Sequence, residues 1–296
     1  MQCVKPITIK QKTRDLDGNY KELEVPCGKC LSCRIKKREE WSLRCIHELT
    51  YWKKSMFLTL TYNDMTLPQN GSLVKKDLQL FFKRLRKNLN GRSIKYFACG
   101  EYGDEKQRPH YHAIIFGVGL NNEDKLIVMS SWNKCDWHNK RIRDNSFGLV
   151  EPESIRYVCQ YIDKKFTGEL EQEVYTDSGR ETPFRLLSQG IGAQYAYDNV
   201  NQIINLGYIT HKGTKNSIPR YYIKKLELDV DELNKNAYYN ECETNAEFCG
   251  IHITLSDAEN SLNSDLIQSI REGQMRQRKQ HDKNIKAKIS MKSRKL

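Results

Sequence analysis

Residues 110–116, HYHAIIF, combine aromatic and β-branched side chains in a run of strand length. In an extended strand residues i and i+2 point to the same face, so His110 and His112 project together while Tyr111 points away. The strand therefore places two imidazoles where they can bind one metal ion. Two polar side chains on a solvated sheet face would give the same pattern.

A carboxylate suited to the same site lies nine positions before His110. Glu101 follows the apolar run IKYFACG, and the next segment, GDEKQRP, is rich in turn residues. A hairpin-like return would bring Glu101 alongside His110 and His112. We expect these three ligands to hold a divalent ion with coordination positions left open. The imidazoles favour Mn²⁺ and the carboxylate accepts Mg²⁺, so both ions stay open.

A second motif lies at residues 153–166, ESIRYVCQYIDKKF, where apolar side chains recur at the spacing of an amphipathic helix. On a neighbouring face Tyr157 and Tyr161 are spaced i, i+4, and Lys164 and Lys165 follow one turn later. Interfacial tyrosines next to lysines at a helix C-terminus would give the same pattern.

Together the two motifs supply what cleavage of a phosphodiester by a tyrosine requires. A phenol has a pKa of roughly 10, so forming the phenolate at neutral pH costs on the order of 4 kcal/mol. A divalent ion and a nearby lysine offset this cost by stabilising the charge that develops in the transition state.

The chain resembles the HUH endonucleases that initiate rolling-circle replication. Closest are the replication initiators of small single-stranded DNA phages, the Microviridae and in particular the gokushoviruses. The resemblance rests on FLTLTY (57–62), GEYGDEKQRPHYHAIIFG (100–117) and RYVCQYIDKKF (156–166). It extends to PCGKCLSCR upstream and to SQGIGAQY and IPRYY downstream, which covers most of residues 1–225.

The resemblance implies a metal held by Glu101, His110 and His112, and a nucleophilic tyrosine on the helix. The phage initiators carry two tyrosines, as here, and either Tyr157 or Tyr161 fits the first role. The first would attack the scissile phosphate, stay attached to the DNA 5′ end and leave a 3′ hydroxyl that primes synthesis. The second would cleave the regenerated origin, so that the released strand is closed into a circle.

The implied partner is single-stranded DNA at the viral origin. The formal net charge of +12, from 49 Lys and Arg against 37 Asp and Glu, favours a polyanion. The chain contains no G-x-x-x-x-G-K-[ST] loop, so duplex unwinding and synthesis would depend on a host helicase and DNA polymerase. No 18 consecutive apolar residues occur, and we expect a soluble protein without a membrane partner in the cytoplasm of a bacterial host.

Ten cysteines in a cytosolic chain favour metal binding or burial over disulfides. Three share the spacing C-x-x-C-x-x-C: Cys27, Cys30 and Cys33. A structural zinc ion needs a fourth ligand, for which Cys3 is the best candidate if strands pair before and after it, with Cys45 and His47 as rivals. An iron–sulfur cluster and reduced, non-ligating thiols are the alternatives.

The order of predicted elements indicates an α+β fold with a central, mainly antiparallel sheet flanked by helices. We expect strand pairing of residues 4–10 with 20–25, helices at 35–52 and 75–89, and the histidine strand at the centre of the sheet. The chain divides into a cysteine-containing segment with a helix (1–54), an HUH nickase domain (55–225), and an extension with a basic tail (226–296).

Two further regions are candidates for DNA contact. The helix at 75–89 has a basic face that would follow a DNA backbone: Lys75, Lys76, Lys83, Arg84, Arg86 and Lys87. Residues 121–146 interleave aromatic and cationic side chains suited to stacking on unpaired bases: Trp132, Trp137, His138, Arg141 and Arg143.

The main alternative function is a zinc-containing DNA-binding or packaging protein in which the histidines have no chemical role. Within the enzymes, a plasmid initiator or transposase with the same site is also consistent with the sequence. The coincidence of Glu101, His110 and His112 with a helix that carries two tyrosines favours the enzyme, because a binding protein needs no phenols opposite a metal.

Overall fold

The computed structural model describes residues 3–14, 20–103, 106–164 and 172–237, together with 276, 279, 280, 283 and 284. The chain separates into two compact units, Met1–Lys37 with Tyr239–Leu296 in one and Arg38–Tyr238 in the other. The three-part division by sequence motifs stays a prediction.

The first unit contains a two-stranded ribbon. Strands β1 (Ile7–Arg14) and β2 (Tyr20–Val25) pair antiparallel with Ile7 opposite Val25, as the sequence predicted. Helix α1 (Leu31–Leu49) begins in this unit and continues into the second. It starts and ends a few residues before the predicted bounds, because the chain at its end tightens into a turn in which the Trp52 amide bonds to the Leu49 carbonyl.

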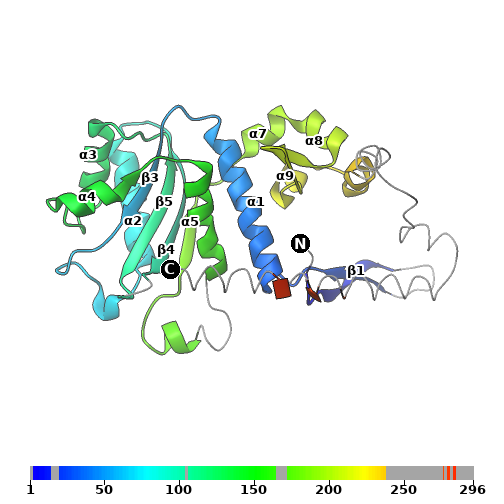
Figure 1. The fold of residues 1–296 in the computed structure, drawn as a ribbon, viewed down its shortest axis with the longest axis horizontal. Helices are drawn as coiled ribbons and strands as arrows, with labels where there is room; N and C mark the ends of the chain where they lie inside the picture. Colours follow the sequence, from blue (N-terminus) through cyan, green and yellow to red (C-terminus); the bar gives the residue numbers. More distant parts are fainter. Residues whose placement is uncertain are drawn as a thin grey trace. The chain divides into compact units, whose positions relative to one another are not determined.

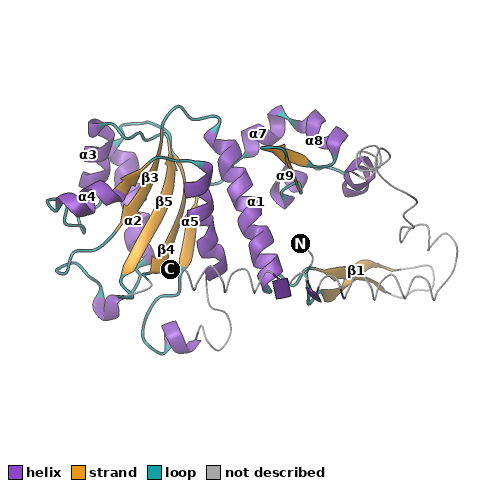
Figure 2. Ribbon diagram, viewed as in Figure 1, coloured by secondary structure: helices purple, strands orange, loops and turns teal. Residues whose placement is uncertain are grey.

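The second unit is built on a five-stranded sheet in the order β6-β3-β5-β4-β7, in which every neighbouring pair is antiparallel. The strands are β3 (Ser55–Leu60), β4 (Lys95–Tyr102), β5 (Pro109–Phe116), β6 (Phe147–Gly148) and β7 (Phe184–Leu187). The histidine strand, β5, is central (Figure 2), and the predicted α+β class is confirmed.

Helices follow the strands in two groups. The first comprises α2 (Lys75–Asn88), α3 (Asn122–Ser131), α4 (Lys140–Ser146) and α5 (Pro152–Lys164), with short turns at Gln69–Gly71 and Gln172–Thr176. The second comprises α7 (Ala193–Asp198), α8 (Val200–Leu206) and α9 (Arg220–Lys225), with a small hairpin of β8 (Ile209–His211) and β9 (Thr214–Asn216). No helix in the described ranges is long and apolar enough to span a bilayer.

The two faces of the sheet are covered by different helices (Figure 1). Helices α2 and α3 pack on one face, where Tyr111, Ala113 and Ile115 of β5 are buried among the core residues. Helices α1 and α5 pack on the other face against Ile114 and Phe116 of the same strand. The alternation of side chains along β5 therefore divides the strand between two cores.

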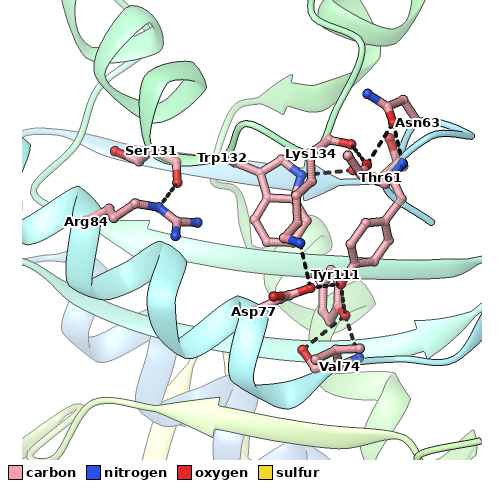
Figure 3. Close-up of polar contacts among 11 residues, drawn as sticks. Thr61, Asn63, Val74, Asp77, Arg84, Tyr111, Ser131, Trp132 and Lys134 are labelled. Carbon is pink, nitrogen blue, oxygen red and sulfur yellow. Dashed lines mark hydrogen bonds and ion pairs between the residues drawn. The ribbon is translucent and has the colours of Figure 1, made fainter. Parts of the chain in front are cut away.

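Tyr111 anchors the central strand to the start of α2. Its hydroxyl accepts a hydrogen bond from the Val74 amide at 2.8 Å, lies 3.2 Å from the Val74 carbonyl, and is 2.8 Å from the Tyr62 hydroxyl (Figure 3). Tyr62 in turn donates to Asp77 at 2.7 Å. Burial raises the pKa of Tyr111 to about 12, so the phenol keeps its proton in this network.

The predicted base-stacking region is wrong for its tryptophans. Trp132 is fully buried in the core and its indole donates to the Thr61 carbonyl at 2.8 Å (Figure 3). Trp137 is half-buried and donates to the Trp132 carbonyl at 2.7 Å. Both rings fill the space beside the sheet instead of facing solvent, because Trp132 sits where α3 ends against the core. His138 and Arg141 are exposed.

The basic face predicted for α2 is present but does not border the histidines. Arg84 is half-buried and donates to the Ser131 carbonyl at 2.8 Å (Figure 3), and Arg86 lies over the Tyr96 ring. Because α2 packs on the opposite sheet face from α5, its exposed lysines lie away from the face that carries His110 and His112.

The second group of helices packs on α1. His47 Nδ1 lies 2.9 Å from the Tyr222 hydroxyl, and its ring stacks on Tyr195 with 3.6 Å between centroids. Arg44 lies 4.0 Å from the centroid of the Trp41 ring and 3.9 Å from that of Tyr221. Burial, with a further contribution from His211, lowers the pKa of His47 to about 3.

Replacing Tyr111 with Phe is expected to lower the free energy of unfolding by about 1–3 kcal/mol, because it leaves the buried Val74 amide without its acceptor. Urea denaturation measures the loss. Tyr197→Phe, at a tyrosine that is 47% exposed, is the control and should stay within about 0.5 kcal/mol of wild type. Equal stability of the two variants would show that the Tyr111 network does not hold β5.

Stability should fall as the pH decreases below about 6.5, the usual pKa of histidine, towards the folded-state pKa of His47 near 3. In this window the unfolded chain binds a proton that the folded chain excludes, with a slope of up to about 1.4 kcal/mol per pH unit. His47→Gln removes this contribution, so its unfolding free energy should change less steeply with pH in urea titrations. Parallel curves would contradict the assignment.

Candidate active site

Strand pairing gathers the predicted acidic and histidine residues on one sheet face. Glu101 of β4 lies directly opposite His110 of β5, and His112 follows two residues later on the same side. The Glu101 carboxylate meets His112 directly, with Oε1 2.8 Å from Nε2. The hairpin-like return expected from the sequence thus delivers the carboxylate to the histidine strand.

His112 is also held from the other neighbouring strand. Thr59 of β3 is its register partner, and Thr59 Oγ1 lies 3.0 Å from His112 Nδ1. Both ring nitrogens of His112 are therefore engaged. Thr59 was missed as a site residue, since its motif FLTLTY reveals a strand but not which of its residues lies opposite His112.

His110 lies beside this pair without joining it. Its Nδ1 is 2.8 Å from the Arg108 carbonyl, an acceptor only, so Nδ1 carries the proton and Nε2 keeps its lone pair. Its ring is nearly parallel to that of His112, with centroids 6.4 Å apart. Burial and then the neighbouring His112 lower the pKa of His110.

Gly103 makes room for the His110 ring. A Cβ at this position would lie 2.9 Å from His110 Cε1 and 3.2 Å from Nδ1, closer than ordinary contact. A side chain at Gly103 would push the imidazole from its place, so the glycine is part of the site although it carries no chemistry.

Helix α5 brings the two tyrosines onto the same face. It begins at Pro152, and the Ser154 hydroxyl accepts from the Glu151 amide at 2.8 Å, which satisfies a donor at the helix start. Ile155 and Val158 are fully buried against the sheet. This packing fixes the face of α5 that looks towards His112.

Tyr161 stacks on His112, with the ring centroids 5.3 Å apart and the planes within 5°. It is only 8% exposed. Burial raises its pKa well above the usual value for a phenol, and hydrogen bonds with Tyr157 and Glu101 add to the shift. Tyr161 is therefore a protonated phenol within the Glu101–His112 pair.

Tyr157 lies one turn earlier and is 43% exposed. Its ring meets that of His112 edge-on at 5.5 Å between centroids and contacts Tyr161 at 5.3 Å and Phe57 at 6.2 Å. The phenol is thus held on its inner side and exposed on its outer side. Of the two predicted lysines, Lys164 ends α5 but its side chain lies outside the described residues, as does all of Lys165.

A cavity of about 560 Å³ opens beside Tyr157. It lies between α1, α5 and the β8–β9 hairpin, and its walls are Arg38, Glu39, Ser42, Leu43, Ile46, Glu153, Arg156, Tyr157, Gln160, His211 and Asn216. The volume is in the range of small-ligand sites. Sequence analysis missed it because its residues come from three distant segments.

Polar groups in the cavity suit an anionic occupant. Arg38 and Arg156 supply two guanidinium groups. Ser42 is 5% exposed, and within the described ranges its hydroxyl has no hydrogen-bond partner. Each of these groups can donate to a phosphate or sugar oxygen.

Comparisons with known proteins agree with the motifs. A family model that describes replication-associated proteins of the ORF2 type matches residues 55–166. The chain is 30% identical to replication-associated protein VP4 of Bdellovibrio phage phiMH2K, over 75% of this chain and 76% of that one. It is 32% identical to replication-associated protein ORF2 of Spiroplasma virus 4, over 72% and 71% of the two chains.

A third relative is replication-associated protein ORF4 of Chlamydia phage 1, which is 28% identical over 77% of this chain and 61% of its own length. No solved structure gives a significant match. The similarity to all three relatives extends well beyond the segment that the family model covers.

Proposed function

Since the chain belongs to the replication-associated proteins of Microviridae and acts in phage replication, we propose that it is a site-specific single-strand DNA endonuclease and strand-transferase. It would initiate rolling-circle replication through a covalent 5′-phosphotyrosine. The observation that carries the proposal is the contact of the Glu101–His112 pair with two tyrosines on one helix face. A protein that only binds DNA has no use for this arrangement.

Tyr157 is the first nucleophile in this proposal. A scissile phosphate must approach the attacking oxygen from solvent, and Tyr157 is 43% exposed whereas Tyr161 is 8% exposed. The raised pKa of Tyr161 also makes its phenolate the harder of the two to form from this arrangement. The exposures thus rank two residues that the sequence alone left equal.

The reaction exchanges one phosphodiester bond for another. The Tyr157 oxygen attacks the phosphorus, the bond from phosphorus to the DNA 3′ oxygen breaks, and that oxygen takes up a proton as the phenol loses one. The product is a 5′-phosphotyrosine and a free 3′ hydroxyl. Tyr161 is one turn away, so a second attack needs only a local change that exposes it.

The cavity beside Tyr157 supports DNA binding at the same place. Arg38 and Arg156 are positioned to contact phosphates on the strand that reaches the nucleophile. Holding the strand there contributes the proximity that a weak phenol nucleophile needs.

The residues present fit a divalent ion. Glu101, His112 and His110 would hold it, and His110 already has the tautomer of a ligating histidine, with Nδ1 bonded to a backbone carbonyl. When bound, Mn²⁺ or Mg²⁺ polarises the phosphate and stabilises transition-state charge. The Thr59 hydroxyl can accept as well as donate, so it can hold His112 when Nε2 becomes a ligand.

The remaining parts of the proposal concern partners. Single-stranded DNA at the viral origin would be the substrate, and a host helicase and DNA polymerase would extend the primer. The relatives are phage proteins, which supports action in the cytoplasm of the bacterial host.

Incubating the protein with end-labelled single-stranded origin DNA and Mn²⁺ or Mg²⁺ should give a covalent adduct on a denaturing gel. Tyr157→Phe should reduce adduct formation by more than about 10³-fold, because it removes the nucleophile. Tyr161→Phe should keep the first cleavage and lose circle closure. Tyr197→Phe, at an equally exposed tyrosine, is the matched control.

An undiminished adduct in Tyr157→Phe would overturn the ranking of the tyrosines. Tight DNA binding with no adduct in any metal would instead support a DNA-binding or packaging protein.

Gly103→Ala should weaken binding of Mn²⁺ by on the order of 10-fold, since the new methyl group displaces the His110 ring. Isothermal titration calorimetry measures the affinity. Gly148→Ala is the control, because its Cβ would meet Phe57 at an ordinary 3.4 Å. If both variants bind Mn²⁺ as wild type does, His110 is not a ligand.

A further inference from the structure

Four cysteines converge in the first unit, away from the proposed chemistry. Cys3 precedes β1, Cys27 and Cys30 follow β2, and Cys33 lies in the first turn of α1. Pairing of Ile7 with Val25 brings the segment that carries Cys3 beside the turn after β2. The four sulfur atoms lie within 4.8 Å of one another, and no other group of His, Cys, Asp and Glu in the described ranges converges in this way.

The distances between sulfurs fit one tetrahedral ion. Cys3 and Cys30 are 3.8 Å apart, and Cys27 and Cys33 are 4.0 Å apart. A disulfide would need about 2.05 Å. Four thiolates at about 2.3 Å from a central zinc ion are separated from each other by about 3.8 Å. A cluster of several iron atoms would hold them further apart.

The backbone around the cysteines is shaped to hold thiolates. The Cys27 amide donates to the Cys3 sulfur and the Cys30 amide donates to the Cys27 sulfur, each at 3.3 Å. Gly28 has a φ of +72°, which a side chain would strain, and this turn lets Cys27 and Cys30 face the same point. Amide donors favour the charged form of the sulfur, which is the form that binds metal.

The ribbon also lacks an alternative source of stability. Among the described residues 3–37 only Ser32 and Ile35 are buried, while Ile7, Ile9 and Leu23 are 43–49% exposed. A two-stranded ribbon of this kind is at best marginally stable in water. Small units without a sufficient core commonly depend on a metal.

We propose that Cys3, Cys27, Cys30 and Cys33 bind one structural zinc ion that fastens the β1–β2 ribbon to the start of α1. The rival fourth ligands considered from the sequence are engaged elsewhere, since Cys45 is fully buried in the core under α1 and His47 is bonded to Tyr222. The site is closed by four protein ligands, as in structural rather than catalytic zinc sites.

The test is the metal content of the full-length protein purified without added metal. Mass spectrometry of the metals should find about one zinc ion per chain. Cys3→Ser and Cys30→Ser should lose it. Cys135→Ser should keep it, because that sulfur lies outside the cluster and bonds to Thr61. His112→Ala should also keep it, which separates this ion from any ion at the proposed catalytic site.

A measurement without substitutions covers the case in which the serine variants do not fold. Exchange of zinc for Co²⁺ in the wild-type protein should give the visible absorption of a tetrahedral cobalt thiolate, since metal geometry is diagnostic. Chelation should make four further thiols reactive. Zinc retained in both serine variants, iron in place of zinc, or no metal with all thiols freely reactive would each overturn the proposal.

Discussion

The two-residue repeat of the central strand is the constraint on which the rest of the second unit depends. Because β5 is paired on both sides, its register cannot shift without moving every side chain to the opposite face. Tyr111 is fixed by hydrogen bonds to α2 on one face, and this leaves His110 and His112 on the other. The core and the site are therefore two consequences of one strand.

The helix that carries the tyrosines adds a second, independent selection. Packing of Ile155 and Val158 against the sheet turns Tyr161 inward onto His112 and leaves Tyr157 at the surface. Chemically identical side chains thereby acquire different exposures, and in our proposal different turns in the reaction. The cavity walls at Tyr157 come partly from α1 and the β8–β9 hairpin, which lie outside the segment matched by the family model.

The fold class, the central position of the histidine strand and the meeting of Glu101 with His112 were predictable, since they follow from strand periodicity and a short return. The role of Thr59, the space left by Gly103 and the burial of Trp132 were not, because each depends on register or packing between distant segments. For the same reason the sequence did not rank Tyr157 and Tyr161. The convergence of Cys3 with the C-x-x-C-x-x-C run was predicted from strand pairing.

The most direct test of the account is the position of a bound ion. Anomalous scattering from crystals grown with Mn²⁺ should place a peak next to Glu101 and His112, within reach of His110 and on the side of the sheet that faces Tyr157. A peak at that point would establish that β5 and α5 together form a metal-dependent site for a tyrosine nucleophile. Saturating Mn²⁺ in solution with no peak at these residues would contradict it.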